Sequence, residues 1–400
     1  MRSGQDKRNE GYRIGYLRIP ARCTGADFEV CAGRHLPLLV LLLVVLPALT
    51  LSGCCATIHI YPEEDEPITE STLTLQALVD RDPPLYYKEV AYDTAWNCTV
   101  TLLDETPASA YTPPEGYGLR VIMDLYQGQV DDLAQTTDQD RYFLERHEAL
   151  AEGDALPPQY DVALTLSEGD YFVLAWADYV PEDNPTDWHY LPDGLTAVTT
   201  DLDTYPDEWH LRSSAAGQEE FVLDFTASPE GYPALQSAPD SLLTDGIVPV
   251  NISRPSGRYR VVSTDAADYV FNGGRLEGIT VQVTYKQFVS DGYNVATQTP
   301  NSYVSTYSFT RTAISTEESD EFDLVGDYLF TAYEGETIVL ADLAFYDAEG
   351  YEVNTVESVE IPLKRNHETI IRGPFLTRKL SGGGSVSIDE NFTDEYVVPV

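Results

Sequence analysis

Hydrophobic and polar residues alternate in short runs along most of the chain, and clusters of Gly, Pro, Asp and Ser separate these runs. The stretch Ser71–Leu78, STLTLQAL, places Leu73 and Leu75 on one face of an extended chain. A period of two residues predicts β-strands with one buried face. The best helix candidate, Arg141–Leu150, is short. The pattern therefore predicts an all-β protein built from antiparallel β-sandwiches.

The stretch Tyr160–Tyr179 predicts a hairpin whose second strand is buried on both faces. Phe172, Leu174 and Trp176 share one face of that strand, and the residues between them are also apolar. A strand that is apolar on both faces is central in its sheet and is covered on both sides.

One strongly apolar run, Leu36–Leu51, lies near the start of the chain. It is shorter than the roughly 20 residues of a membrane-spanning helix, and it reads as the apolar part of a signal peptide. The residues Leu51-Ser52-Gly53-Cys54 that end it resemble the lipobox of bacterial lipoproteins. The sequence therefore predicts a lipid anchor on Cys54, with an ordinary secretory signal as the alternative. A start codon placed too far upstream would explain the long segment before Arg34.

Turn-rich composition and similar strands divide the rest of the chain into two domains. The stretch Ala227–Gly246 is rich in Pro, Ser, Gly and Asp and predicts a linker. The sequence Gly-Asp-Tyr followed by apolar residues begins at Gly169 and again at Gly326, which favours two related domains, although aromatic strands also resemble each other by chance. The predicted parts are an upstream extension and lipoprotein signal peptide at 1–53, an N-terminal β-sandwich domain at 54–245, a C-terminal β-sandwich domain at 246–377 and a tail at 378–400.

The composition excludes several kinds of partner and site. A formal net charge of −42 repels nucleic acid, so no nucleic-acid partner is expected. Cys55 and Cys98 allow one disulfide, but so few cysteines do not indicate a disulfide-dependent fold.

A search for catalytic chemistry finds no nucleophile elbow, zinc-protease motif, phosphate-binding loop or CxxC pair. The histidines stand apart without metal-ligand spacing. The acidic stretch Asp183–Gly194 has oxygen groups that suit Ca²⁺, but it lacks the order of an EF-hand and is interpreted as a solvated loop. No catalytic residue, metal or cofactor is predicted, and a hydrolase is a distant alternative.

Several stretches, in their order along the chain, carry a resemblance to a known family. They are the lipobox, GDYFVLAWADY from Gly169, VNISRPSGRYRVVSTD from Val250, IPLKRNHETIIRGPFLT from Ile361 and the tail GGGSVSIDENFTDEYVVPV from Gly382. Together they resemble the fimbrillin-type lipoproteins of Bacteroidota, which are subunits and anchors of type V pili. The resemblance covers most of residues 54–400. It implies two tandem transthyretin-like β-sandwich domains and a lipid-anchored protein of the outer membrane that reaches the cell surface or the fimbria.

The resemblance also implies a route of assembly with other fimbrial subunits as partners. In the family's main subunits, a protease cuts after an arginine in the first domain, and the vacated groove accepts the C-terminal strand of a neighbour. The candidate cleavage site is Arg81, although Asp82 and Pro83 are unfavourable for a serine protease, and an uncut anchor or accessory subunit is as plausible as a shaft subunit. The candidate donor-strand side chains are Val386, Ile388, Phe392, Tyr396, Val398 and Val400. The alternative is that the tail pairs within its own domain or frays.

A polar stretch between Pro181 and His210 is the candidate contact loop for a host or bacterial surface ligand. It carries Trp188, Tyr190 and Trp209. Exposed aromatic rings there would also suit the rival hypothesis, a surface glycan-binding lipoprotein without catalysis. The alternative is that these rings close over the edge of a sandwich.

Overall fold

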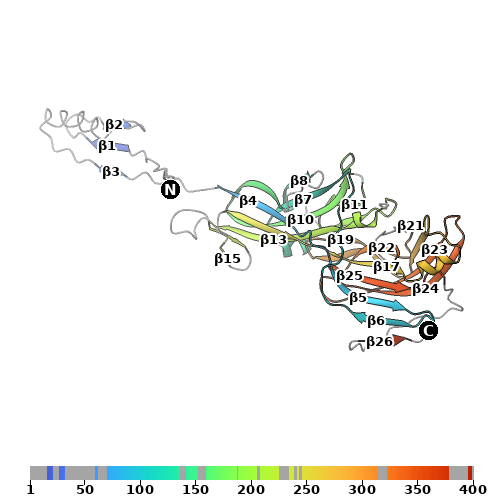
Figure 1. Ribbon diagram of the computed structural model, residues 1–400. Coiled ribbons are helices and arrows are strands. Elements are labelled where there is room, and N and C mark those ends of the chain that lie inside the picture. The colour runs from blue at the N-terminus through green and yellow to red at the C-terminus, as the bar shows by residue number, and fades with distance from the viewer. Residues whose placement is uncertain are drawn as a thin grey trace, which may run out of the picture. The chain divides into compact units, whose positions relative to one another are not determined.

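The protein is almost entirely built of β-strands in a computed structural model (Figure 1), which confirms the predicted all-β class. The chain divides into two compact units, residues 1–68 and 69–400. The structure describes residues 16–20, 27–31, 59–61, 70–135, 141–151, 159–186, 188–204, 208–224, 234–237, 241–242, 246–313, 322–377 and 395–398.

The first unit contains one antiparallel sheet. Its strands are β1 (Tyr16–Pro20), β2 (Asp27–Cys31) and β3 (His59–Tyr61), in the order β2-β1-β3. The apolar run and Cys54 lie outside the described residues, so the signal peptide and the lipid anchor stay predictions.

The first sandwich of the second unit packs a six-stranded sheet against a three-stranded sheet. The six strands are, in spatial order, β15 (Ser241–Leu242), β14 (Ala234–Ser237), β13 (Ser214–Asp224), β10 (Gly169–Pro181), β7 (Tyr117–Gln127) and β8 (Phe143–Ala151). The three strands are β16 (Ile247–Ile252), β4 (Glu70–Val79) and β9 (Gln159–Ser167). All these pairs are antiparallel except β16 with β4, which run parallel.

The alternation of apolar residues in β4 and β9 produces the core of this sandwich. Leu73, Leu75 and Ala77 in β4 are at most 3% exposed, and the residues between them face outward. Val162 and Leu164 in β9 are buried in the same way. Because successive strand side chains point to opposite faces, the buried set of each short strand meets the six-stranded sheet.

The strand β10 is central and covered on both faces, as its composition predicts. Tyr171, Val173 and Ala175 belong to the core of the first sandwich, whereas Phe172 and Trp176 belong to a second cluster on the opposite face. That face is covered by the helix α2 (Val130–Gln135) and by a four-stranded sheet. The strands of this sheet are, in spatial order, β11 (Tyr190–Leu191), β12 (Val198–Thr200), β19 (Val289–Asn294) and β20 (Thr299–Val304).

The second sandwich packs a six-stranded sheet against a four-stranded sheet around one core. The six strands are, in spatial order, β22 (Phe322–Phe330), β17 (Ser256–Ser263), β25 (His367–Gly373), β5 (Leu85–Tyr92), β6 (Cys98–Leu102) and β26 (Glu395–Val398). The four strands are β21 (Ser308–Thr312), β18 (Thr280–Tyr285), β23 (Thr337–Tyr346) and β24 (Glu352–Leu363). Two short helical elements, η3 (Trp209–Arg212) and α3 (Ala266–Phe271), complete the unit.

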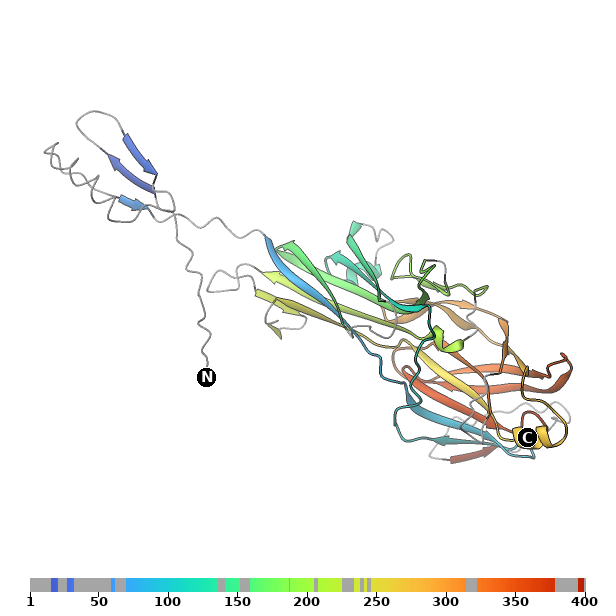
Figure 2. The same ribbon diagram turned by 45° about the horizontal axis from the view of Figure 1, so that its top comes forward.

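The strand pairing does not follow the predicted division at residues 245 and 246. The early strands β5 and β6 belong to the second sandwich, where β5 pairs parallel with β25. Figure 2 shows these two blue-to-cyan strands beside the orange and red strands. Conversely, β16 comes after the predicted boundary in the sequence but belongs to the first sandwich. Parallel pairing joins segments that are distant in the sequence, and the local period of a strand carries no information about its partner.

Two local predictions also require correction. The helix candidate Arg141–Leu150 is the strand β8, because its backbone pairs along β7. The stretch Ala227–Gly246, predicted as a linker without strands, contains β14 and β15. Tertiary pairing overrides a weak local preference in both places.

Candidate functional site

The strand β4 is the middle strand of the three-stranded sheet and ends just before Arg81. It pairs antiparallel with β9 and parallel with β16, so it separates two strands that do not pair with each other. Arg81 is exposed in the short connection from β4 to β5. The next residue donates its backbone N–H to the Asp80 carboxylate at 2.9 Å. A peptide bond cut after Arg81 would separate β4 from the rest of the second unit.

The C-terminal strand β26 pairs with β6 of its own chain and forms the edge of that six-stranded sheet. The two strands are antiparallel, with Tyr396 opposite Val100 and Val398 opposite Cys98. Of the predicted donor-strand residues, these two tail residues lie in β26. The others, Val386, Ile388, Phe392 and Val400, lie outside the described residues. The described part of the tail therefore pairs within its own chain, and the donor strand stays a prediction.

The strand β6, next to the edge, contributes alternate side chains to the second core. Cys98 and Val100 are 1% and 3% exposed, whereas Thr99 and Thr101 are partly exposed. Burial is the main cause that raises the pKa of the Cys98 thiol to about 11, and the thiol is free. Its possible disulfide partner, Cys55, lies outside the described residues. Cys98 thus acts as a small apolar residue beneath β26.

The candidate contact loop does not present its three aromatic rings to solvent. Tyr190 is 2% exposed and donates its hydroxyl hydrogen to the backbone oxygen of Arg212 at 2.7 Å. Trp209 is 6% exposed and stacks on His210 with a centroid distance of 3.7 Å. Trp188 is half-buried and packs on Tyr117. The prediction of an aromatic contact surface is therefore wrong for Tyr190 and Trp209, because these rings fill space between strands.

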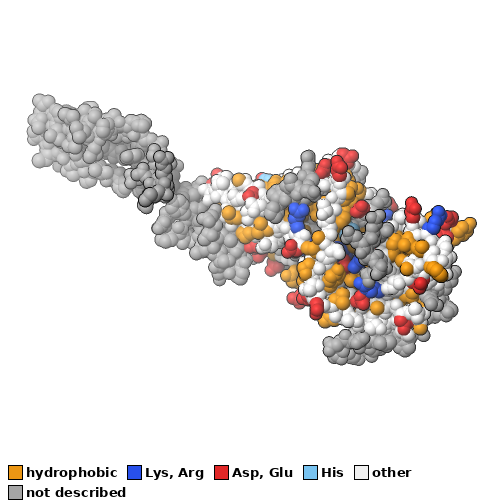
Figure 3. Space-filling view, viewed as in Figure 1, with side chains coloured by type: hydrophobic (Ala, Val, Ile, Leu, Met, Phe, Trp, Pro, Cys, Tyr) orange, Lys and Arg blue, Asp and Glu red, His pale blue; other side chains and the backbone are white. Residues whose placement is uncertain are grey.

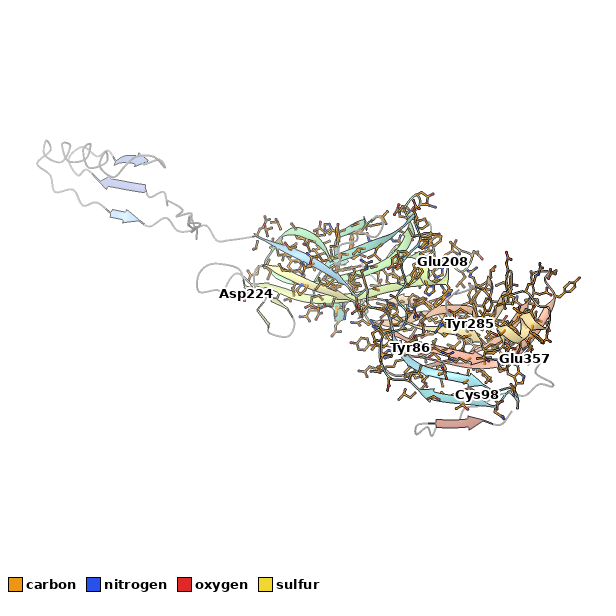
Figure 4. All side chains as sticks on the ribbon, in the orientation of Figure 1. Tyr86, Cys98, Glu208, Asp224, Tyr285 and Glu357 are labelled. Carbon is orange, nitrogen blue, oxygen red and sulfur yellow. The ribbon has the colours of Figure 1, made fainter. Side chains whose placement is uncertain are left out.

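A buried polar cluster joins the two sandwiches through Asp327 in β22. This carboxylate is fully buried and pairs with Arg212 of η3. It also accepts a hydrogen bond from the hydroxyl of Tyr285, which is labelled in Figure 4, at 2.6 Å. On its other side, Arg212 donates Nε–H to His189 Nε2 at 2.7 Å. Sequence patterns do not identify this cluster, because its members are separated by up to 138 positions along the chain.

A second buried ion pair lies next to this cluster. The Arg120 guanidinium of β7 donates to both carboxylate oxygens of Asp178 in β10, at 3.0 and 2.7 Å. It also donates to the backbone oxygen of Tyr190 at 3.2 Å. Because the Tyr190 hydroxyl contacts Arg212, polar contacts continue from the first sandwich to Asp327. The arrangement holds the sandwiches together and contains no nucleophile activated by a base.

The buried His189 and the partly buried His210 give the fold a dependence on pH. Burial, helped by the charges of Arg258 and Arg260, lowers the pKa of His210 to about 3. Burial and the charge of Arg212 lower the pKa of His189 well below its usual value. Both rings stay neutral in the folded chain, whereas the unfolded chain protonates them below about pH 6.5. Their contribution to stability is therefore complete above about pH 6.5 and is lost as the pH falls toward the folded pKa.

Replacing His210 with glutamine is expected to flatten this dependence. Urea unfolding at several pH values between about 6 and 4 should show a slope of the unfolding free energy smaller by about 1 kcal/mol per pH unit than in the wild type. A slope equal to that of the wild type would contradict the account of His210.

The described residues contain no group of three or more His, Cys, Asp or Glu side chains arranged to hold a metal ion. In the same part of the chain, no helix has the length and hydropathy needed to span a membrane. Figure 3 shows acidic side chains scattered over the visible face.

Comparisons with solved structures find distant similarities to proteins of Bacteroidota. One is a protein from Bacteroides ovatus whose name proposes a role in cell adhesion, with 12% identity and a TM-score of 0.35 over 73% of this chain and 93% of that chain. Another is the fimbrial anchor protein Mfa2 from Porphyromonas gingivalis, with 10% identity and a TM-score of 0.30 over 68% of this chain and 82% of that chain. A third is a fimbrial assembly protein from Parabacteroides distasonis, with 10% identity and a TM-score of 0.30 over 76% and 91%.

Among curated proteins, no match to the chain was found. One family model matches residues 89–400, which include most of both sandwiches and the C-terminal strand. On this match, the chain belongs to the family of unknown function DUF6562.

Proposed function

We propose that the chain is a lipid-anchored cell-surface protein that acts as a structural or accessory subunit of fimbriae, with a role in adhesion. The observation that carries the proposal is the position of β4 between β9 and β16, directly before the exposed Arg81. A strand in this position is the one that a cut at Arg81 would release. Its departure would leave a groove with unpaired backbone groups on both sides, which is the form of site that strand addition needs.

The groove left by β4 would also need apolar side chains at alternate positions. Leu73, Leu75 and Ala77 fill it in the intact chain. Each fully buried leucine contributes about 2 kcal/mol, so β4 would leave only if another strand replaced these contacts. The tail offers Val386 and Ile388 two residues apart, and the three glycines before them, Gly382-Gly383-Gly384, have the composition expected of a flexible hinge. A neighbour's tail therefore has the pattern to replace β4.

The pairing of β26 with β6 supports the same function in another way. This pairing supports a tail that is long enough to reach a sheet and that adds a strand to its edge. In a free subunit the tail would cover β6, and in a fimbria it would be donated to the next subunit. The lipid on Cys54 would keep the first subunit at the outer membrane.

The substitution Arg81→Gln is expected to prevent assembly. Purified full-length protein treated with an Arg-specific protease should form ladders that resist heating in detergent on a gel, and the cleaved chain should begin at Asp82. The Arg81→Gln protein should form no ladder, because β4 stays covalently attached. A matched control is Arg275→Gln, which removes another exposed arginine and should leave the ladder unchanged.

Ladders from the Arg81→Gln protein would show that another bond is cut. Cleavage at Arg81 without any ladder would contradict a shaft subunit and favour an anchor, which receives or fixes other subunits without donating a strand.

A further inference from the structure

The two places where the chain crosses between the sandwiches lie side by side. Residues 80–84 lead from β4 to β5, and residues 253–255 lead from β16 to β17. The backbone N–H of Asp80 donates to the backbone oxygen of Ile252 at 2.8 Å. A cavity of about 50 Å³ lies at these crossings. Among its lining residues are Arg81, Tyr111, Tyr179, Ser213, Arg254 and Arg258.

Arg254 is a buried guanidinium whose acceptors among the described residues are all neutral. It is 8% exposed. Its Nε–H donates to Ser213 Oγ and one Nη–H donates to the backbone oxygen of Asp82, both at 3.1 Å, and the other Nη donates to Asn366 Oδ1. None of these acceptors is charged, and a guanidinium has five N–H donors, so two remain for another ligand. Buried charges in proteins are normally paired, and here the described residues supply no carboxylate to Arg254.

Arg258 adds a second guanidinium to the wall of the cavity. It is 3% exposed, and its terminal nitrogens contact Glu368 and the hydroxyl of Tyr328. Its Nε–H is buried with no acceptor among the described residues. Arg258 therefore contributes positive charge beside Arg254.

The charges around the cavity leave one positive charge without a counterpart. The lining contains Arg81, Arg254, Arg258 and one acid, Asp80, and Glu368 pairs with Arg258 from outside the lining, so three positive charges meet two negative ones. The acceptors of Arg254 among the described residues are all neutral. The charges of Arg81 and Arg254 also act on the Tyr179 hydroxyl, where they oppose the effect of burial, which raises its pKa. A single net positive charge is neutralised by a monoanion, whereas a dianion would leave one buried negative charge without a counterpart.

We propose that this cavity is a binding site for a small carboxylate group, held by the free N–H donors of Arg254, with the charge of Arg258 beside them. Two parallel N–H donors of one guanidinium match the two oxygens of a carboxylate. The cavity has room for a few water molecules or for one group of this size. An occupant would contact both chain crossings at once and would hold the two sandwiches in place.

The test is calorimetric titration of the full chain with sodium acetate, inorganic phosphate and sodium chloride at matched ionic strength and about pH 7.5. We expect saturable binding of acetate, binding of phosphate about tenfold weaker, and no saturable heat with chloride. Arg254→Lys keeps the charge but loses the planar pair of donors, and it should weaken acetate binding about tenfold. Arg275→Gln, at an exposed and distant ion pair, should bind acetate like the wild type.

Absence of saturable acetate binding to the wild type would overturn the proposal. Arg254 would then be a residue that stabilises the two chain crossings through its hydrogen bonds. Phosphate binding tighter than acetate binding would overturn the assignment of a carboxylate. If Arg254→Lys fails to fold, Ser213→Ala takes its place, because it frees the Nε–H of Arg254 and changes the geometry of the site. Unchanged acetate affinity in the folded variant would also overturn the proposal.

Discussion

Replacing Asp327 with asparagine is expected to lower the free energy of unfolding by about 3–5 kcal/mol. The Asp327 carboxylate is fully buried, pairs with Arg212 and accepts the hydrogen bond of the Tyr285 hydroxyl. Asparagine has nearly the same shape, but it leaves the buried Arg212 guanidinium without its counter-charge. An uncompensated buried charge is costly, which is why the loss exceeds that of an ordinary hydrogen bond. Urea denaturation followed by circular dichroism measures the change.

A matched control lies on the same strand. Asp323 pairs with Arg260 at 2.7 Å, and both side chains are partly exposed. Solvent screens this pair, so Asp323→Asn should cost less than about 1 kcal/mol. Equal losses for the two variants would contradict the role given to the buried cluster.

Replacing Trp176 with alanine is expected to cost about 3–5 kcal/mol. The indole ring is fully buried on the outer face of β10. It packs edge-on against Tyr190 of β11, with a centroid distance of 5.3 Å, and against Phe330 of β22, with a centroid distance of 6.2 Å. Alanine would leave a cavity between the first sandwich, the four-stranded sheet and the second sandwich. Thermal or urea unfolding should show a large loss of stability.

The half-buried Trp188 is the control for this substitution. It packs on Tyr117 near the surface, and Trp188→Ala should cost about half as much or less, since solvent fills the space that the ring leaves. A smaller loss at Trp176 than at Trp188 would contradict the assignment of Trp176 to the centre of the layers.

The sequence predicts those parts of the fold that depend on the period of a single strand. The alternation around Leu73 and Leu75 identifies a half-buried strand, and the doubly apolar run around Trp176 identifies a central one. The sequence Asp347-Ala348-Glu349-Gly350 is typical of a hairpin loop, and there the Asp347 carboxylate accepts the backbone N–H groups of Glu349 and Tyr351. In each case the signal lies within a few neighbouring residues.

The sequence fails where a feature depends on partners that are distant in the chain. The strands β5 and β16 each belong to the sandwich opposite to the one that the sequence predicts. Each pairs in parallel with a strand that is distant in the sequence, and the local pattern does not encode such pairing. The burial of Trp209 depends on close approach to Gly326, where a side chain would collide with the indole ring. The composition of the loop around Trp209 looks polar, so only the tertiary contacts show that the ring is buried.

The sequence predicts Arg81 as a cleavage site only through a resemblance, and the structure adds a physical argument for that position. Arg81 is exposed and follows a strand that lies between two strands without a direct bond between them. A donor strand could therefore enter where β4 leaves without rebuilding the six-stranded sheet opposite.

The central claim is that one copy donates its tail to another, and mixed-isotope cross-linking tests it most directly. Equal amounts of ¹⁴N and ¹⁵N protein are cut with the Arg-specific protease, allowed to assemble and treated with a carboxyl-reactive cross-linker. Asp161 on β9 contacts Gln76 of β4 in the intact chain and would face a donated strand after β4 leaves. We predict mixed-isotope links between Asp161 and the tail carboxylates Asp389 or Glu390. Tail links that join only residues of the same isotope, at β6 and not at β9, would contradict assembly by strand donation.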